Sequence, residues 1–295
     1  MRDTAQPPTG LARRGRRLPE PETERRMLEA ALAEVKRSGL SVSLDSISME
    51  DVIREAGVSR SAVYRRWPYK DLFVSDLVKV LAEAAVPSAA DYEAVIGVIK
   101  AVAAGHDSWL ETAEGRHGLL VEVFRQTALA DFEALYRSPE WRTYLALHAT
   151  FIGLPAGQLR DEVQATLARS QQGFIGRVAR AWEHMANLFG YRLRPELGAS
   201  YEVLATLVSA ISRGLILMSL SMPELAGERL KASPFGATGV EEWSLVATGM
   251  AAVAFAFFEP DPALEWGPER VAVLRQALAA LSAPPWLTPK EGDEH

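Results

Sequence analysis

The chain has 295 residues, of which 48% are hydrophobic and 24% are charged, and its formal net charge is −6. This composition is sufficient for one large or about two smaller packed domains and excludes a wholly disordered chain. The absence of cysteine excludes disulfides, thiolate metal sites and cysteine nucleophiles.

No membrane-spanning segment is expected. The apolar run Met250–Phe258 has nine residues, and Arg213 interrupts the other long run, whereas a span needs roughly 18 apolar residues. The N-terminal arginines are not followed by the apolar segment of a secretory signal. We therefore expect a cytoplasmic protein.

Positive charge is concentrated in two short segments. Residues 1–17 have a net charge of +4, residues 59–70 also have +4, and the other 266 residues together have −14. Because phosphate binding depends on where the positive charge lies, the negative total does not exclude a nucleic-acid partner.

Residues 1–21 are predicted to be a flexible, arginine-rich arm, because they contain four prolines and no apolar period. Arg14 and Arg16 flank a glycine within this arm. They are candidates for insertion into a narrow minor groove, and a plain electrostatic tail is the alternative. Either role steepens the salt dependence of DNA binding.

Three helices follow the arm. Apolar residues at spacings of three and four predict a helix over 22–38. Ser48 can cap a second helix over 49–56, which Gly57 ends, and Ser59 can cap a third over 60–67. A fourth helix is expected to begin near residue 70.

Two short helices joined by three residues predict a helix-turn-helix, in which the second helix enters the DNA major groove. Val63, Trp67 and Leu72 are expected in a small core with the first helix. The opposite face carries candidate DNA contacts, for which solvated charge (Arg65) and packing over the first helix (Tyr64) are the alternatives. These candidates are Ser59, Arg60, Ser61, Tyr64 and Arg65.

The remaining chain also predicts helices, separated by proline and glycine, and no strand alternation stands out, so the fold class is predicted to be all-α. Residues 222–239 are expected to be a loop and the tail after residue 283 to be irregular. The predicted helices are 70–85, 90–113, 116–136, 139–152, 157–189, 198–221, 240–258 and 268–282.

The segment from Met49 to Phe73 resembles the DNA-binding segment of TetR-family transcriptional regulators, on Ala56-Gly57-Val58-Ser59 followed by Tyr64, Trp67, Lys70 and Leu72 at the family's spacing. The resemblance implies a helix-turn-helix domain over 22–80 and a ligand-binding and dimerisation domain over 81–295. It further implies phosphate contacts from Ser48 and Lys70, base contacts from Arg60 and Ser61, and a phosphate or thymine contact from Tyr64.

A homodimer on a palindromic operator is expected, because helix-turn-helix proteins read two half-sites. Residues 203–221 and 245–258 are apolar almost all round and are candidates for the dimer interface, with a central core position as the alternative. The resemblance also implies a ligand cavity, and the composition of the middle helices suggests an amphipathic or largely apolar small molecule as the effector. The candidate residues of this cavity, for which core or rim positions are the alternative, are His117, Phe124, Trp141, His148 and Trp182.

None of the common catalytic or nucleotide-binding motifs is present, so we expect no enzyme activity, no catalytic residue, no metal and no cofactor. The sequence therefore predicts a ligand-responsive transcriptional regulator, in particular a repressor that leaves its operator when the effector binds. A ligand-independent DNA-organising protein of the same fold is the alternative.

Overall fold

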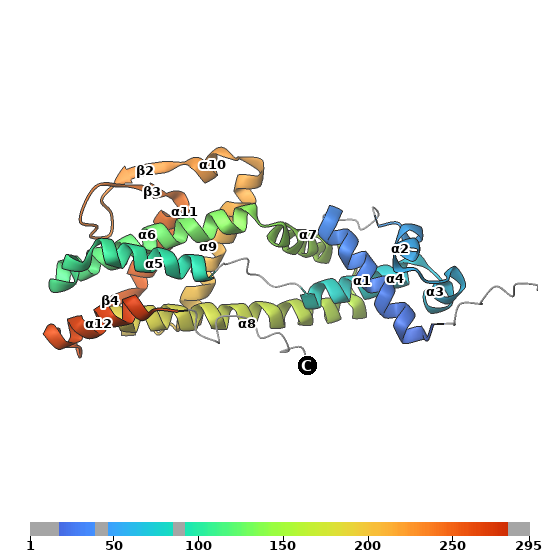
Figure 1. The fold of residues 1–295 in the computed structure, drawn as a ribbon, viewed down its shortest axis with the longest axis horizontal. Helices are drawn as coiled ribbons and strands as arrows, with labels where there is room; N and C mark the ends of the chain where they lie inside the picture. Colours follow the sequence, from blue (N-terminus) through green and yellow to red (C-terminus); the bar gives the residue numbers. More distant parts are fainter. Residues whose placement is uncertain (1–17, 39–46, 85–91, 283–295) are drawn as a thin grey trace, which may run out of the picture. The chain divides into compact units, whose positions relative to one another are not determined.

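The structure is a computed structural model that describes residues 18–38, 47–84 and 92–282. Helices account for most of the described residues, which confirms the all-α class (Figure 1). The chain divides into two compact units, Met1–Leu81 and Ala82–His295. The predicted arm with Arg14 and Arg16 lies outside the described residues, as do most of the loop before Ser48 and the C-terminal tail.

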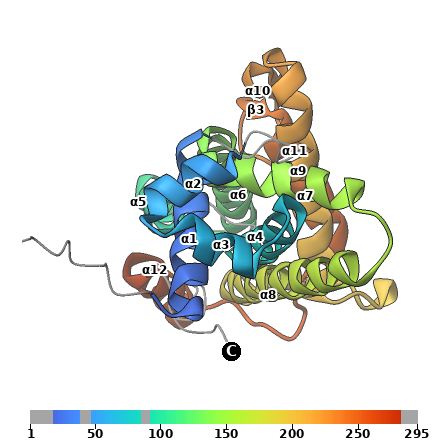
Figure 2. The same ribbon diagram turned by 90° about the vertical axis from the view of Figure 1, so that its right-hand side faces the viewer.

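The first unit is built from α1 (Glu20–Ser38), α2 (Met49–Ala56), α3 (Arg60–Arg66) and α4 (Lys70–Ala84), which are coloured blue to cyan in Figure 2. Helix α1 begins two residues earlier than predicted. Pro21 does not prevent this, because the first turn of a helix needs no backbone N–H donor.

One residue of α3, Val63, and the C-cap residue of that helix, Trp67, lie at the centre of the first unit. Val63 and Trp67 are fully buried, as predicted, and the Trp67 ring meets Phe73 edge to face at 5.2 Å between centroids. The prediction that Leu72 belongs to this core is wrong, since Leu72 is 48% exposed. In α4 the inward face is set by the four-residue spacing of Phe73 and Leu77, which turns Leu72 toward solvent.

Arg66 connects α3 to two neighbouring helices. Its guanidinium donates to Glu24 of α1 at 2.9 Å and to Asp76 of α4 at 3.0 Å. The Trp67 indole N–H donates to the same Asp76 carboxylate at 2.9 Å. Arg66 therefore stabilises the helix-turn-helix, because its guanidinium is bound to acidic residues within the first unit.

The second unit differs from the prediction near its start. The prediction of one continuous helix over 90–113 is wrong. Helix α5 (Tyr92–Gly105) ends at a glycine, and a 3-10 helix, η1 (Asp107–Glu111), follows it. Glycine destabilises a helix interior, and Thr112 caps a new helix here by accepting from Gly115 N. The further helices are α6 (Ala113–Arg137), α7 (Pro139–Gly153), α8 (Gln158–Phe189), η2 (Pro195–Leu197), α9 (Tyr201–Ser221), α10 (Glu224–Gly227), α11 (Leu245–Phe257) and α12 (Pro268–Ala280).

Two small antiparallel sheets are present, although no strand alternation stands out in the sequence. β1 (Tyr191–Leu193) pairs with β4 (Phe258–Pro260), and β2 (Arg229–Ala232) pairs with β3 (Glu241–Ser244). The predicted loop over 222–239 therefore contains a helical turn and a strand, and the helix predicted from residue 240 begins only after β3. Strands of three or four residues are too short to show a legible alternation.

Helix α9 continues through Arg213 for 21 residues. Within the described ranges it is the one helix that is long and apolar enough to cross a bilayer, judged by length and composition alone. The same criterion is met by interior helices of water-soluble proteins.

Candidate DNA-reading surface and ligand cavity

Local capping determines where α2 and α3 begin and end. The Ser48 hydroxyl oxygen accepts from Asp51 N and the Ser59 hydroxyl oxygen accepts from Ala62 N, both at 3.3 Å. Between the helices, Gly57 has a φ of +64°, a left-handed conformation that a side chain disfavours. The two helices are thus separated by a tight, glycine-dependent turn.

The outward face of α3 carries the predicted DNA contacts. Neighbouring Ala62 and Val63 are buried, so the helix presents one face to the core and the other to solvent. Arg65 forms no ion pair with any described residue. Lys70 at the start of α4 is half-buried, whereas the remaining candidates are exposed: Ser48, Ser59, Arg60, Ser61, Tyr64 and Arg65.

A carboxylate that the sequence analysis missed lies on this surface. Glu50, in the first turn of α2, forms an ion pair with Arg60 and accepts a hydrogen bond from the Tyr64 hydroxyl at 3.0 Å. The hydrogen bond to Glu50 raises the pKa of Tyr64 above its ordinary value. No periodicity links residue 50 to residues 60 and 64, so only packing of α2 against α3 reveals this contact.

This arrangement suits contact with duplex DNA. A guanidinium can donate twice to guanine O6 and N7, and the hydroxyls of Ser61 and Tyr64 can reach bases or phosphates. Glu50 holds the side chains of Arg60 and Tyr64 on the exposed surface. An exposed ion pair contributes only about 0–1 kcal/mol to stability, so little free energy is lost when Arg60 leaves Glu50 to bind DNA.

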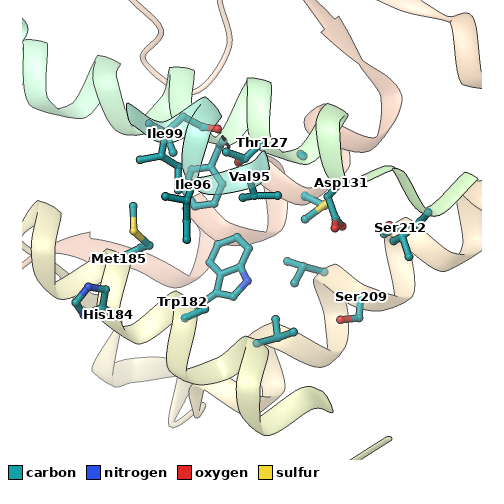
Figure 3. Close-up of a pocket in the computed structure, with 18 of the residues that line it drawn as sticks. Val95, Ile96, Ile99, Thr127, Asp131, Trp182, His184, Met185, Ser209 and Ser212 are labelled. Carbon is teal, nitrogen blue, oxygen red and sulfur yellow. Dashed lines mark hydrogen bonds between the residues drawn. The ribbon is translucent and has the colours of Figure 1, made fainter. Parts of the chain in front are cut away.

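The second unit contains a cavity of about 260 Å³ between α5, α6, α8 and α9, with Met250 of α11 in its lining. Three of the five predicted pocket residues, Phe124, Trp141 and Trp182, line it. Phe124 and Trp182 stack with their centroids 4.8 Å apart. Figure 3 shows the Trp182 indole projecting from α8 into the cavity.

His117 does not line the cavity, because both of its ring nitrogens hold other parts of the second unit. Nε2 lies 2.7 Å from the Phe235 carbonyl oxygen and Nδ1 lies 2.5 Å from the Tyr191 hydroxyl. The carbonyl can only accept, so Nε2 donates to it, and in the neutral imidazole Nδ1 then accepts from the Tyr191 hydroxyl. Burial raises the pKa of Tyr191 to about 12, which keeps its hydroxyl protonated as the donor.

His148 is also absent from the lining. Its Nδ1 donates to the Tyr144 carbonyl oxygen one turn earlier at 3.0 Å, and its ring tilts against the Tyr144 ring. Burial lowers the pKa of His148, which favours the neutral imidazole. Both histidines are better described as structural residues than as ligand contacts.

Two charged residues of the cavity lining were not among the predicted pocket residues. Asp131 of α6 and Arg213 of α9 both line it, together with the hydroxyls of Ser209 and Ser212. Asp131 lies seven residues after Phe124, which places an acid on the same helical face as an aromatic cavity residue. A charge within an apolar stripe is the sequence signal that marks both residues, Asp131 after Phe124 and Arg213 within the apolar run of α9.

Comparisons with known proteins show limited similarity. No family model and no curated protein matches the chain. A solved structure, the SmeT–triclosan complex, aligns with 83% of this chain and 99% of its own, at 17% sequence identity and a TM-score of 0.37. A TM-score of this size does not establish a common fold.

Proposed function

We propose that the chain is a ligand-responsive, DNA-binding transcriptional regulator of the TetR type, and specifically a cytoplasmic repressor. The observation that carries the proposal is the capped α2–Gly57–α3 unit, with Val63 and Trp67 buried and Arg60, Ser61 and Tyr64 exposed. This separation of buried and exposed residues is typical of a recognition helix. One face of such a helix packs into the core of its domain, and the other face enters the major groove.

The cavity supports ligand control and disfavours the ligand-independent alternative. Its lining is mostly apolar with a few polar groups, as in sites for small molecules. Helix α4 runs from Lys70, next to the recognition helix in the chain, to Ala84, beyond the end of the first unit. A ligand that prefers one orientation of α4 changes the spacing of two recognition helices and lowers operator affinity.

DNA binding itself is tested with the full chain and a labelled duplex from the promoter beside its own gene. We expect a shifted complex that an unlabelled scrambled duplex does not displace, because base contacts add roughly 1,000-fold or more over non-specific binding. Tyr64→Ala and Lys70→Ala should weaken the complex. Equal affinity for both duplexes would indicate a DNA-organising protein, and no binding to either at low salt would exclude the proposal.

We propose that the exposed apolar side of α9 forms the dimer interface. Exposed apolar or small residues recur along it at spacings of four and three, which is the pattern of a helix–helix seam. Ala252 and Ala256 of α11 are exposed as well, and α11 packs against α9. The residues of this stripe are Val203, Leu207, Ala210, Gly214 and Leu217.

The double substitution Leu207→Glu, Leu217→Glu is expected to convert a dimer to a monomer, because it places two buried charges on each side of the interface. Sedimentation velocity measures the change, and circular dichroism checks that helices are retained. Ile152→Glu is the matched control, since Ile152 of α7 is 75% exposed and lies off the stripe. A double variant that stays dimeric would place the interface elsewhere.

A further inference from the structure

Asp131 is an unpartnered acid in the wall of the cavity. It projects from α6 and is partly buried (Figure 3). Within the part of the chain that the structure describes, its carboxylate has no hydrogen bond and no ion pair. A desolvated carboxylate without a partner is costly, and such groups recur where a ligand supplies the partner.

The surroundings of Asp131 are apolar and aromatic. Val95 and Ile96 of α5 and the stacked rings of Phe124 and Trp182 form much of the lining. Burial raises the pKa of Asp131 to about 6, with no neighbouring charge as a further cause. The group is therefore mostly ionised at pH 7, in a lining where aromatic faces also attract cations.

The other charged residue of the lining, Arg213, contacts a neutral hydrogen-bond acceptor and aromatic rings. Arg213 donates from Nη1 to the Gln171 side-chain oxygen at 2.7 Å, and its guanidinium lies 5.1 Å from the Phe174 ring centroid and 5.4 Å from that of Trp141. One nitrogen, Nη2, is buried without a hydrogen-bond partner. A third ring, that of Tyr144, lies 5.6 Å from the guanidinium. The cation thus has an acceptor and three aromatic rings beside it, whereas the Asp131 carboxylate has no donor among the described residues.

We infer that the ligand of this cavity is an apolar amine, protonated at neutral pH, whose ammonium group pairs with Asp131. The inference rests on the proposed function in treating this ligand as the effector. The ammonium supplies charge-assisted hydrogen bonds to the carboxylate, and the hydrocarbon part replaces water against α5 and α8. Ser209 and Ser212 on α9 offer hydroxyls for a second polar group, since the Ser212 hydroxyl is buried without a partner.

Calorimetric titration of the full chain with three matched probes tests the inference: 4-phenylbutylamine, 4-phenylbutan-1-ol and 4-phenylbutanoate. They share one apolar body and differ in the charge of the end group. We expect the amine to bind about tenfold or more tighter than the alcohol, and the carboxylate to bind weakest. Asp131→Asn, which keeps the shape and removes the charge, should abolish the preference and leave the affinity for the alcohol within about twofold.

Two controls separate this result from misfolding and from net charge. Removal of an unpaired, desolvated charge should leave the melting temperature of Asp131→Asn at pH 7 equal to or above that of the wild type. Asp161→Asn alters the same charge at an exposed position of α8 outside the cavity lining and should keep the amine preference.

Three outcomes overturn the inference: tighter binding of the carboxylate, an amine preference that survives Asp131→Asn, or no binding of any probe at millimolar concentration. The operator titration is independent of these measurements. Specific operator binding without an Asp131-dependent amine preference overturns this inference alone. An Asp131-dependent preference without duplex binding overturns the proposed function and leaves the amine site established.

Discussion

Arg60→Ala is expected to weaken binding to the operator by at least about tenfold while changing binding to a scrambled duplex by only a few-fold. A guanidinium that donates twice to guanine contributes about 1–3 kcal/mol of discrimination, and a dimer carries two copies. A contact to phosphate alone would weaken both duplexes equally and would lower the salt slope by about one unit per contact. Fluorescence anisotropy with both duplexes at several salt concentrations distinguishes the two roles.

A matched control for Arg60 exists in the second unit. Arg137 of α6 has a side chain that is 74% exposed, against 72% for Arg60, and it also pairs with a glutamate, Glu133. Arg137→Ala should leave both affinities unchanged. Equal losses for Arg60→Ala and Arg137→Ala would show that the effect is one of net charge and not of the recognition helix.

Glu50→Gln in the same assay reports on the carboxylate that holds Arg60 and Tyr64. Its removal takes a negative charge away from the surface that faces phosphates, so affinity for both duplexes should rise several-fold. A fall in operator affinity alone would instead show that Glu50 positions Arg60 for its base, which surface ion pairs rarely do strongly.

Trp67→Ala is expected to unfold the helix-turn-helix and to abolish DNA binding. Trp67 is fully buried, meets Phe73 edge to face and donates to Asp76, so its truncation leaves a large cavity and removes one of the two hydrogen bonds that Asp76 accepts. Replacement of a buried tryptophan by alanine costs about 3–5 kcal/mol, a large share of the stability of a small helical unit. Hydrogen exchange should show lost protection of amides in α1 to α3.

Trp67→Phe provides the graded comparison. It keeps an aromatic ring against Phe73 and loses the hydrogen bond to Asp76, so the loss of protection should be smaller and DNA binding should persist. Unchanged protection of α1 to α3 in Trp67→Ala would contradict the central position of this residue in the first unit.

Signals that act between close neighbours in the chain were sufficient to predict the helix-turn-helix unit. Ser48 and Ser59 cap helices three residues ahead, and Gly57 adopts a conformation that depends on its own missing side chain. These effects are local, so α2 begins and ends where the sequence predicts. The core position of Leu72 was predicted wrongly because the choice between it and Phe73 depends on the orientation of α4.

The cavity could not be assigned in the same way. His117 does not line the cavity, because it is hydrogen-bonded to partners that lie 74 and 118 residues away in the chain. The short strands β1 and β4 pair across a similar separation and leave too few residues for a periodic pattern.

The sequence by itself determined the helical class and the capped two-helix unit with its cationic outer face, because helix periodicity and capping depend on residues within one or two turns. Only the tertiary structure decided that Glu50 joins Arg60 and Tyr64 and that Asp131 faces an apolar cavity without a partner among the described residues. Burial and pairing of these carboxylates depend on how separate helices pack together, and the spacing of residues within one helix does not encode that arrangement.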